Sequence, residues 1–358
     1  MDDFIFLFIL PLFASAVISF LTTAVVIRLA KYLKIIDDPL KNKHPKVIHQ
    51  KPTPRGGGIA IFLALFLSLI FLLPLDKHLS GILMGAFVIA CMGFLDDRLN
   101  LNPYVRLGMG FLAASMPIAA GIGISFLTSP LGGIIDLSQP QINFSLFGAS
   151  HSIWILSDIF ALFWIVTLMN ILNMGAKGVD GQLSGVVIIS AITISALSFF
   201  YSADITQWPV IIMTASLAGA FLGFFPWHKF PQRIMPGYGG ATLAGYFLAI
   251  AAILSTTKVG TLIVVLGIPL IDTGYTIARR IFSGKSPVWG DTGHLHHRLM
   301  AAGLSKKQVA QIYWSATAVL GIMALNLNST YKLYTMIGAS LILGCLILWL
   351  TYRSKLSK

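Results

Sequence analysis

Glutamate is absent from this 358-residue chain, so all 13 of its acidic residues are aspartates. Charged residues of both signs make up only 11% of the sequence, against about 25% in soluble globular proteins. So few charges cannot cover the surface of a water-soluble domain, which excludes a soluble enzyme and a disordered chain. Cysteine is also scarce. Cys91 and Cys345 both lie inside apolar runs, so the chain is not a disulfide scaffold either.

Long apolar runs are what the chain has in quantity, because 56% of its residues are hydrophobic and its mean hydropathy is +0.83. A helix that spans a bilayer needs about 20 mostly apolar residues. Eleven windows qualify, and they predict an all-α polytopic membrane protein in which residues 1–358 form a single membrane-embedded domain. The windows cover residues 4–28, 57–75, 79–95, 106–126, 153–173, 183–202, 208–225, 240–256, 259–278, 309–327 and 332–352.

Basic residues are distributed unevenly between the two predicted faces of this membrane protein. Lys and Arg number 25, which gives a net charge of +12. If the N-terminus lies outside, 22 of these 25 fall on inner segments, and the exceptions are Lys77, Lys258 and Lys332. Because Lys and Arg collect on the cytoplasmic side of membrane proteins, we expect an outer N-terminus and a cytoplasmic C-terminus. The surplus would also suit an anionic lipid or a phosphorylated substrate, and we expect no nucleic-acid partner.

The connection over residues 127–152 is expected on the outer face and contains no Lys or Arg. Residues 132–137 and 141–146 are two strand-like segments separated by Ser-Gln-Pro. Short β-rich runs around a Pro-bearing turn are typical of a hairpin. We therefore expect these two segments to pair as a small β-hairpin that caps the outer face.

Two adjacent carboxylates, Asp96 and Asp97, close the third apolar window. Adjacent carboxylates repel each other and are costly near hydrocarbon unless a cation neutralises them. The pair could bind a divalent metal ion. Alternatively, it could be a solvated helix end that Arg98 and Arg106 neutralise.

A second polar cluster ends the fifth window, in the stretch from Asn170 to Gln182. Asn170 and Asn173 are three residues apart, so they share one face of a helix. Buried amides need hydrogen-bond partners, which a ligand could supply. The glycine-rich segment that follows, with Lys177 and Asp180, lets backbone N–H groups approach a phosphate or a base. The alternative is a flexible turn whose amide pair holds neighbouring helices together.

Three imidazoles and an arginine lie together in a later inner segment, as His294, His296, His297 and Arg298. Such a group suits the binding of phosphate oxygens. A zinc site is less favoured, because no cysteine or glutamate is available and the nearest acid is Asp291. A solvated basic loop is the remaining alternative.

In their order along the chain, five motifs resemble those of the polyprenyl-phosphate N-acetylhexosamine-1-phosphate transferases. They are Pro-Thr-Pro-Arg-Gly-Gly, Asp-Asp, Asn-x-x-Asn with Gly-Val-Asp-Gly, Pro-Leu-Ile-Asp-Thr and His-Leu-His-His-Arg. The resemblance covers roughly residues 30–300 and includes the eleven-span pattern. The histidine motif and Asp272 look closer to the branch that uses UDP-N-acetylglucosamine. The phospho-N-acetylmuramoyl-pentapeptide branch, the alternative within the family, usually shows three consecutive histidines.

The resemblance implies transfer of a sugar 1-phosphate from a UDP-sugar to undecaprenyl phosphate, with release of UMP, in cell-envelope polysaccharide synthesis. It places the enzyme in a bacterial inner membrane with its active site on the cytoplasmic face, and leaves open whether it forms an oligomer. It implies Mg²⁺, or Mn²⁺, held by Asp96, Asp97 and Asp272. The catalytic set would be Asp96, Asp97, Asn173 and Asp180, with Asp180 on the uracil side. The substrate-binding set would be Lys51, Arg55, Asn170, Lys177, His294, His296, His297 and Arg298.

Two positions depart from the pattern of these transferases. Lys177 stands where they have the first aspartate of Asp-Gly-x-Asp-Gly, one residue farther from Asn173 than usual. Tyr238 stands where they have an aspartate that binds magnesium, and a phenol is a weaker ligand for that ion than a carboxylate. An active transferase is the leading hypothesis. A catalytically silent relative that binds the same ligands, and a transporter, are the alternatives.

Overall fold

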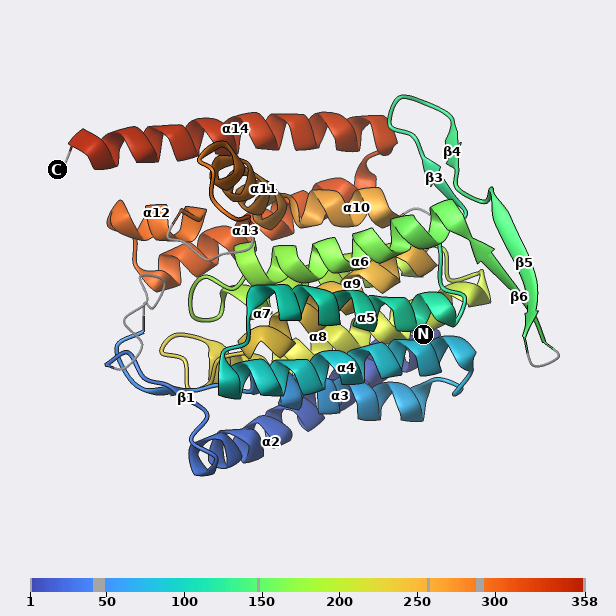
Figure 1. The fold of residues 1–358 in the computed structure, drawn as a ribbon, viewed down its shortest axis with the longest axis horizontal. Coiled ribbons are helices and arrows are strands. Elements are labelled where there is room, and N and C mark those ends of the chain that lie inside the picture. The colour runs from blue at the N-terminus through green and yellow to red at the C-terminus, as the bar shows by residue number, and fades with distance from the viewer. Residues whose placement is uncertain (1, 41–48, 147–148, 256–257, 288–292, 357–358) are drawn as a thin grey trace.

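The computed structural model describes residues 2–40, 49–146, 149–255, 258–287 and 293–356. Most of the chain forms long helices that run back and forth along the longest axis of the molecule (Figure 1). A short α1 (Asp2–Phe4) and a π-helical turn η1 (Ile5–Ile9) lead into the first of them. The helices that follow are α2 (Leu10–Tyr32), α3 (Gly57–Leu72), α4 (Lys77–Leu99), α5 (Pro103–Ala119), α6 (Ile155–Gly175), α7 (Gln182–Phe199), the 3-10 turn η2 (Ile205–Gln207), α8 (Trp208–His228), α9 (Gly237–Leu254), α10 (Lys258–Val265), α11 (Gly267–Phe282), α12 (Leu295–Ala301), α13 (Lys306–Asn326) and α14 (Ser329–Leu356).

The all-α membrane architecture expected from the sequence is confirmed. Each of the apolar windows contains a helix, and eight helices of the described chain are long and apolar enough to cross a bilayer. The bent pair of α10 and α11 would make a ninth span. α3 and α5 have 16 and 17 residues, and at about 1.5 Å per residue they are short for a hydrocarbon core of about 30 Å. The count of eleven spans therefore stays a prediction.

α9 is the central helix of the bundle. All of its residues except the last are buried, and α3, α4, α6 and α8 pack around it. Gly93 of α4 touches the backbone of α9, because a Cβ atom on Gly93 would lie 2.5 Å from the Cα of Gly239. This contact brings the first turn of α9 against the end of α4, where Asp96 and Asp97 lie.

α10 and α11 meet at a bend of 78°, so α11 leaves the direction of the bundle and is seen nearly end-on in Figure 1. Asp272, Thr276 and Arg280 of α11 are all buried. Residues four apart share one face of a helix, so α11 turns a polar stripe toward the protein.

α14 packs against α10, α11 and α12, and only 17% of its apolar window is buried, which makes it an outer edge of the bundle.

Two β-hairpins lie at one end of the bundle (Figure 1). β3 (Phe126–Thr128) pairs antiparallel with β4 (Ile134–Asp136), and β5 (Gln141–Leu146) pairs with β6 (Ala149–Trp154). The expected hairpin between residues 132–137 and 141–146 is therefore wrong: both segments are strands, but each pairs with a different neighbour. Gly132 and Gly133, with φ angles of +104° and +78°, form the turn that folds β4 back onto β3.

The opposite end of the bundle carries most of the residues that were predicted to form a site. β1 (Ile36–Asp37) and β2 (Thr53–Pro54) form a short antiparallel pair there. α4 and α10, which begin at Lys77 and Lys258, start instead at the hairpin end (Figure 1). Lys41, Lys43 and Lys46, which were expected on the inner face, lie outside the described residues. The orientation across the membrane stays a prediction.

Candidate active site

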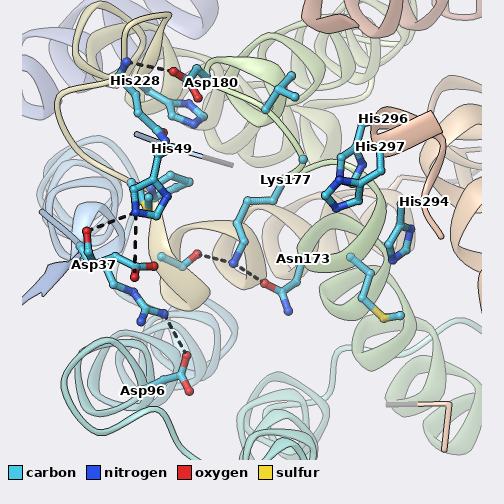
Figure 2. Close-up of a pocket in the computed structure, with 18 of the residues that line it drawn as sticks. Asp37, His49, Asp96, Asn173, Lys177, Asp180, His228, His294, His296 and His297 are labelled. Carbon is cyan, nitrogen blue, oxygen red and sulfur yellow. Dashed lines mark hydrogen bonds and ion pairs between the residues drawn. The ribbon is translucent and has the colours of Figure 1, made fainter. Parts of the chain in front are cut away.

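A cavity of about 280 Å³ opens at the end of the bundle opposite the hairpins. Helices α4, α5, α6, α8, α9, α11 and α12 all contribute to its wall. Figure 2 shows Lys177 reaching into its middle, with Asp96 on one side and the histidines of α12 on another. The charged and imidazole side chains that line it are Asp37, His49, Arg55, Asp96, Arg106, Lys177, Asp180, His228, Arg280, His294, His296 and His297. Four Lys and Arg side chains thus face three carboxylates.

Two arginines neutralise the acid pair at the end of α4. Asp96 and Asp97 are only 1% and 6% exposed, so the pair is buried and is not a solvated helix end. Arg55, placed by the β1–β2 pair, has its Nε 3.1 Å from Oδ1 of Asp97 and its Nη2 3.9 Å from Oδ2 of Asp96. Arg106 has Nη1 3.4 Å from both oxygens of Asp96. A buried carboxylate needs such partners, whereas Arg98, expected among them, is exposed.

The first turn of α9 completes this part of the cavity. Gly237 has a φ of +67°, and a Cβ atom there would lie 2.1 Å from Oδ2 of Asp97, so only glycine fits. The hydroxyl of Tyr238 donates to the carbonyl oxygen of Arg106 at 3.2 Å. The guanidinium carbon of Arg106 lies 5.4 Å from the centre of the Tyr238 ring, a cation–π distance. Tyr238 therefore holds Arg106 at both its backbone and its side chain.

Lys177 lies in the turn between α6 and α7. Its ammonium group donates to Oδ1 of Asn173 at 2.7 Å and to the carbonyl oxygen of Gly237 at 3.2 Å. The pKa of Lys177 is lowered to about 7, chiefly by burial and then by the neighbouring Arg55 cation, while the Asp97 and Asp96 charges oppose the shift. An additional negative charge in the cavity would favour the protonated form of this lysine.

His296 and His297 lie on the short helix α12, and His294 is the residue directly before it. Nδ1 of His294 is 2.9 Å from Oδ2 of Asp272, and the Leu295 N–H donates to Oδ1 of the same carboxylate at 2.7 Å. Asp272 therefore orients His294 and starts α12. Burial, followed by the charges of His297 and His294, lowers the pKa of His296 well below its usual value, which keeps this imidazole neutral. A Cβ atom on Gly178 would lie 2.3 Å from Cγ of His296, so the Lys177 turn packs directly on that ring.

Asp180 lies next to His228, the last residue of α8, and Lys177 lies between Asp180 and Asp96 (Figure 2). Its Oδ2 accepts a hydrogen bond from the Gln232 N–H at 3.2 Å, and its Oδ1 is 3.7 Å from Nζ of Lys306. His228, which sequence reasoning did not select, is nearby, with Nδ1 2.7 Å from the Ser184 hydroxyl.

Arg280 is a second lining residue that sequence reasoning missed. It is 3% exposed and donates to the carbonyl oxygen of Pro287 at 2.7 Å. Its position, eight residues after Asp272 and four after Thr276, was the available signal, because these spacings put all three side chains on one face of α11. His49, whose Nε2 is 3.2 Å from the Asp37 carbonyl oxygen, shows no comparable pattern in the sequence.

Three of the predicted substrate-binding residues do not line the cavity. Lys51 is exposed. Asn170 donates its side-chain amide to the carbonyl oxygen of Val166 within α6, at 2.8 Å. Arg298 turns away from the cavity: it donates to the Gly293 carbonyl oxygen at 2.9 Å and to the Thr351 hydroxyl of α14. The structure brings the other predicted residues together, but their roles stay predictions.

The expected magnesium site is not assembled by these residues. Among the parts of the chain that the structure describes, no group of three or more His, Cys or Asp side chains is placed to hold a metal ion. Asp96 already forms an ion pair with Arg106 and accepts a hydrogen bond from the Leu101 N–H. Both oxygens of Asp272 form hydrogen bonds, one with the His294 ring and one with the Leu295 N–H. The donor set of the described residues therefore does not fit a bound Mg²⁺, Mn²⁺ or Zn²⁺ ion.

Fold and cavity together define a polytopic membrane protein with a basic polar pocket at one end of its helix bundle. The model of glycosyl transferase family 4 matches residues 79–256, from α4 to the end of α9, and the chain belongs to this family.

Curated relatives match over most of their length. The probable undecaprenyl-phosphate N-acetylglucosaminyl 1-phosphate transferase of Bacillus subtilis is 28% identical over 339 residues, which cover 92% of this chain and 87% of the relative. The decaprenyl-phosphate N-acetylglucosaminephosphotransferase of Mycobacterium leprae is 27% identical over 368 residues, covering 93% and 86%. A phospho-N-acetylmuramoyl-pentapeptide-transferase of Streptococcus pyogenes serotype M3 is 26% identical over 325 residues, covering 86% and 93%.

Proposed function

We propose that this protein transfers a sugar 1-phosphate, specifically an N-acetylhexosamine 1-phosphate, from a UDP-sugar to undecaprenyl phosphate and releases UMP. One observation carries the proposal: the cavity joins four cations, Arg55, Arg106, Lys177 and Arg280, to the histidines of α12 at one end of a membrane bundle. Relatives that match nearly the whole chain are named as N-acetylglucosamine 1-phosphate transferases that use undecaprenyl or decaprenyl phosphate.

The reaction joins two phosphate groups that repel each other. An oxygen of the lipid phosphate attacks the sugar-bearing phosphorus, and a new P–O–P linkage forms. The bond from that phosphorus to the oxygen that bridges to the second phosphorus breaks, and UMP leaves with that oxygen. Because the attacking phosphate is already ionised, the main requirement is to neutralise the charge that accumulates. A pocket with an excess of fixed cations meets this requirement.

The side-chain positions suggest how the substrates divide the cavity. Lys177 faces the histidines of α12 across the middle of the pocket (Figure 2), and we place the diphosphate between them. Asp272 fixes the ring of His294, and His296, being neutral, offers a single N–H donor. We place the uridine at Asp180, on the side of the cavity next to Gln232.

The acid pair acts mainly through the arginines that it holds. The side chains of Arg55 and Arg106 are 17% and 25% exposed, whereas those of Asp96 and Asp97 are 2% exposed. The guanidinium groups, and not the carboxylates, are therefore the groups accessible to a phosphate. We place the lipid phosphate at these arginines. Asp96 and Asp97 are positioning residues in this arrangement.

We also propose that the protein lies in a bacterial inner membrane with this cavity on the cytoplasmic face. The support is the basic excess at the cavity end, because 22 of the 25 Lys and Arg residues fall on the segments expected there. Single cysteines introduced at Lys229 and at Thr330, in a background with Cys91 and Cys345 replaced, test this in intact cells. A membrane-impermeant maleimide should label position 330 and leave position 229 unlabelled, and the reverse pattern would contradict the orientation.

UMP release tests the proposed activity. Purified protein in nanodiscs should release UMP from UDP-N-acetylglucosamine only when undecaprenyl phosphate is present, and a lipid-linked sugar should form in equal amount. Arg106→Ala should lower the rate roughly 10- to 150-fold, the effect of losing one charge-assisted hydrogen bond. Arg98→Ala, an exposed arginine beside the same acid pair, is the matched control and should not change the rate. Binding of both substrates with no UMP release would instead identify a catalytically silent relative.

A further inference from the structure

The two residues that depart from the transferase pattern, Lys177 and Tyr238, are neighbours in space. Lys177 donates to the carbonyl oxygen of Gly237, the residue directly before Tyr238. Both lie beside the buried Asp97, which the Cα of Gly237 approaches closely. The departures therefore meet at one point of the wall of the cavity, which Lys177 and Gly237 line and Tyr238 supports from behind, although 61 positions separate them in the sequence.

Each departure fixes a cation at this point. Lys177 brings its own ammonium group, which is held by two neutral oxygen acceptors, on Asn173 and Gly237. Tyr238 holds Arg106 through a 3.2 Å hydrogen bond to its carbonyl oxygen and a cation–π contact of 5.4 Å. With Arg55, which is 3.1 Å from Asp97, three cations surround a buried acid pair.

We propose that Lys177, together with Arg106 held on Tyr238, replaces a divalent metal ion in this enzyme, so that it binds the diphosphate of its UDP-sugar and transfers the sugar 1-phosphate without a bound metal. This inference rests on the proposed function for the reaction, but it concerns how the charge is neutralised. The fit of the residues supports it, because the carboxylates that would hold a metal are already paired with arginines.

The charges in this region favour an anion over another cation. Asp96 and Asp97 carry two negative charges, and Arg55, Arg106 and Lys177 carry three positive charges when all are ionised. A metal ion at Asp97 would have to displace Arg55 and would be repelled by Lys177, whereas the diphosphate of a UDP-sugar is attracted to both. Fixed groups also need no reorganisation when the charge develops.

The experiment uses the full-length protein in nanodiscs, treated with EDTA, and measures two quantities. The first is UMP release from UDP-N-acetylglucosamine and undecaprenyl phosphate, in EDTA and across a magnesium titration. The second is binding of UDP-N-acetylglucosamine by calorimetry in EDTA. We expect equal rates of UMP release with and without magnesium. We also expect the wild type to bind UDP-N-acetylglucosamine in EDTA as tightly as it does with magnesium. Lys177→Ala should weaken binding roughly 10- to 150-fold, and added magnesium should not restore it. Lys229→Ala, an exposed lysine at the same end of the bundle, should bind normally.

Tyr238 gives a second set of variants. Tyr238→Phe keeps the ring beside Arg106 and should retain more metal-independent binding than Tyr238→Leu, which removes both contacts. Manganese binding, followed by electron paramagnetic resonance with no nucleotide present, should be absent in the wild type. The double variant Lys177→Asp/Tyr238→Asp places two further carboxylates next to Asp97 and should bind manganese.

The outcomes separate this inference from the proposed function. UMP release that needs magnesium overturns the inference and leaves the proposed function intact. No UMP release under any condition contradicts the proposed function and the transfer step of the inference, and calorimetry then decides the metal-free binding of the diphosphate by itself. Nucleotide-sugar binding in EDTA that Lys177→Ala weakens supports it. Nucleotide-sugar binding that requires magnesium overturns it. Binding of manganese by the wild-type protein with no nucleotide present also overturns it.

Discussion

Gly237 is the position at which a single methyl group should disturb the cavity most. Its φ of +67° is in the left-handed region, and for a residue with a side chain this conformation costs roughly 1–2 kcal/mol. In addition, the Cβ atom of Gly237→Ala would lie 2.1 Å from Oδ2 of Asp97. These atoms cannot approach so closely, so the carboxylate or the start of α9 must move by about 1 Å, which is the shortfall from an ordinary contact distance near 3 Å.

That movement should reach the groups assigned to the substrates. Asp97 would leave its 3.1 Å contact with Arg55, and the Gly237 carbonyl oxygen would leave its 3.2 Å contact with Lys177. A displacement of about 1 Å at a positioning group can lower turnover about 100-fold. We therefore expect Gly237→Ala to reduce UMP release about 100-fold, with a loss of stability of only a few kcal/mol.

Gly132→Ala is the matched control, because it separates backbone strain from displacement of the carboxylate. Gly132 also has a positive φ, +104°, but a Cβ atom there would meet nothing within 4 Å. Both variants should unfold at lower temperature than the wild type in detergent, and only Gly237→Ala should lose turnover. If folded Gly237→Ala releases UMP at the wild-type rate, the proposed link between α9 and the acid pair is refuted.

Three further predictions concern other parts of the cavity. The pKa of Lys177 is about 7, so its cation is present below that pH and lost above it. UDP-sugar binding, measured by calorimetry, should weaken as the pH rises through about 7 and should stay level in Lys177→Arg, because arginine remains charged; a level wild-type profile would contradict this role. Asp272→Asn should lower UMP release roughly 10- to 150-fold by freeing His294, and nitrogen-15 chemical shifts of that ring should change with it; unaltered kinetics would remove Asp272 from the site. Gly178→Ala, whose Cβ would press on the His296 ring, should raise the KM for UDP-sugar while leaving the KM for the lipid unchanged, and equal effects on both would count against the diphosphate placement.

The helices were predictable because bilayer thickness imposes a length and an apolar composition on each span. The hairpin pairing was not, because it depends on where the chain turns. Gly132 and Gly133 turn the chain before β4, and strand alternation alone does not show which neighbour a strand will choose. A short strand can pair on either side, so the pairing of residues 132–137 with 141–146 was a reasonable but wrong prediction.

The residue types of the site were predictable from the sequence. The directions in which their side chains point were less predictable. Adjacent aspartates at a membrane boundary require cations, and the structure supplies them from Arg55 and Arg106, but Arg55 comes from 41 positions away in the chain. His294, His296, His297 and Arg298 were expected from the sequence to bind the same ligand. The last three lie on the helix α12, and residues two apart on a helix point in nearly opposite directions. His296 therefore faces the cavity while Arg298 faces α14.

Because Arg298 points away from the cavity and toward α14, the last helix helps to hold the histidine helix in place. Only 17% of the apolar window of α14 is buried in the protein, yet Thr351 near its end accepts a hydrogen bond from Arg298. At the other end of the same short helix, Asp272 of α11 binds His294. The histidine helix is thus fastened at both ends, once to the bent span and once to the final one. A truncated protein that stops before Ser329 would keep every residue that lines the cavity and would lose one of the two fastenings of its histidines. Purification tags and fusion partners are therefore better attached after an intact α14 than in place of it.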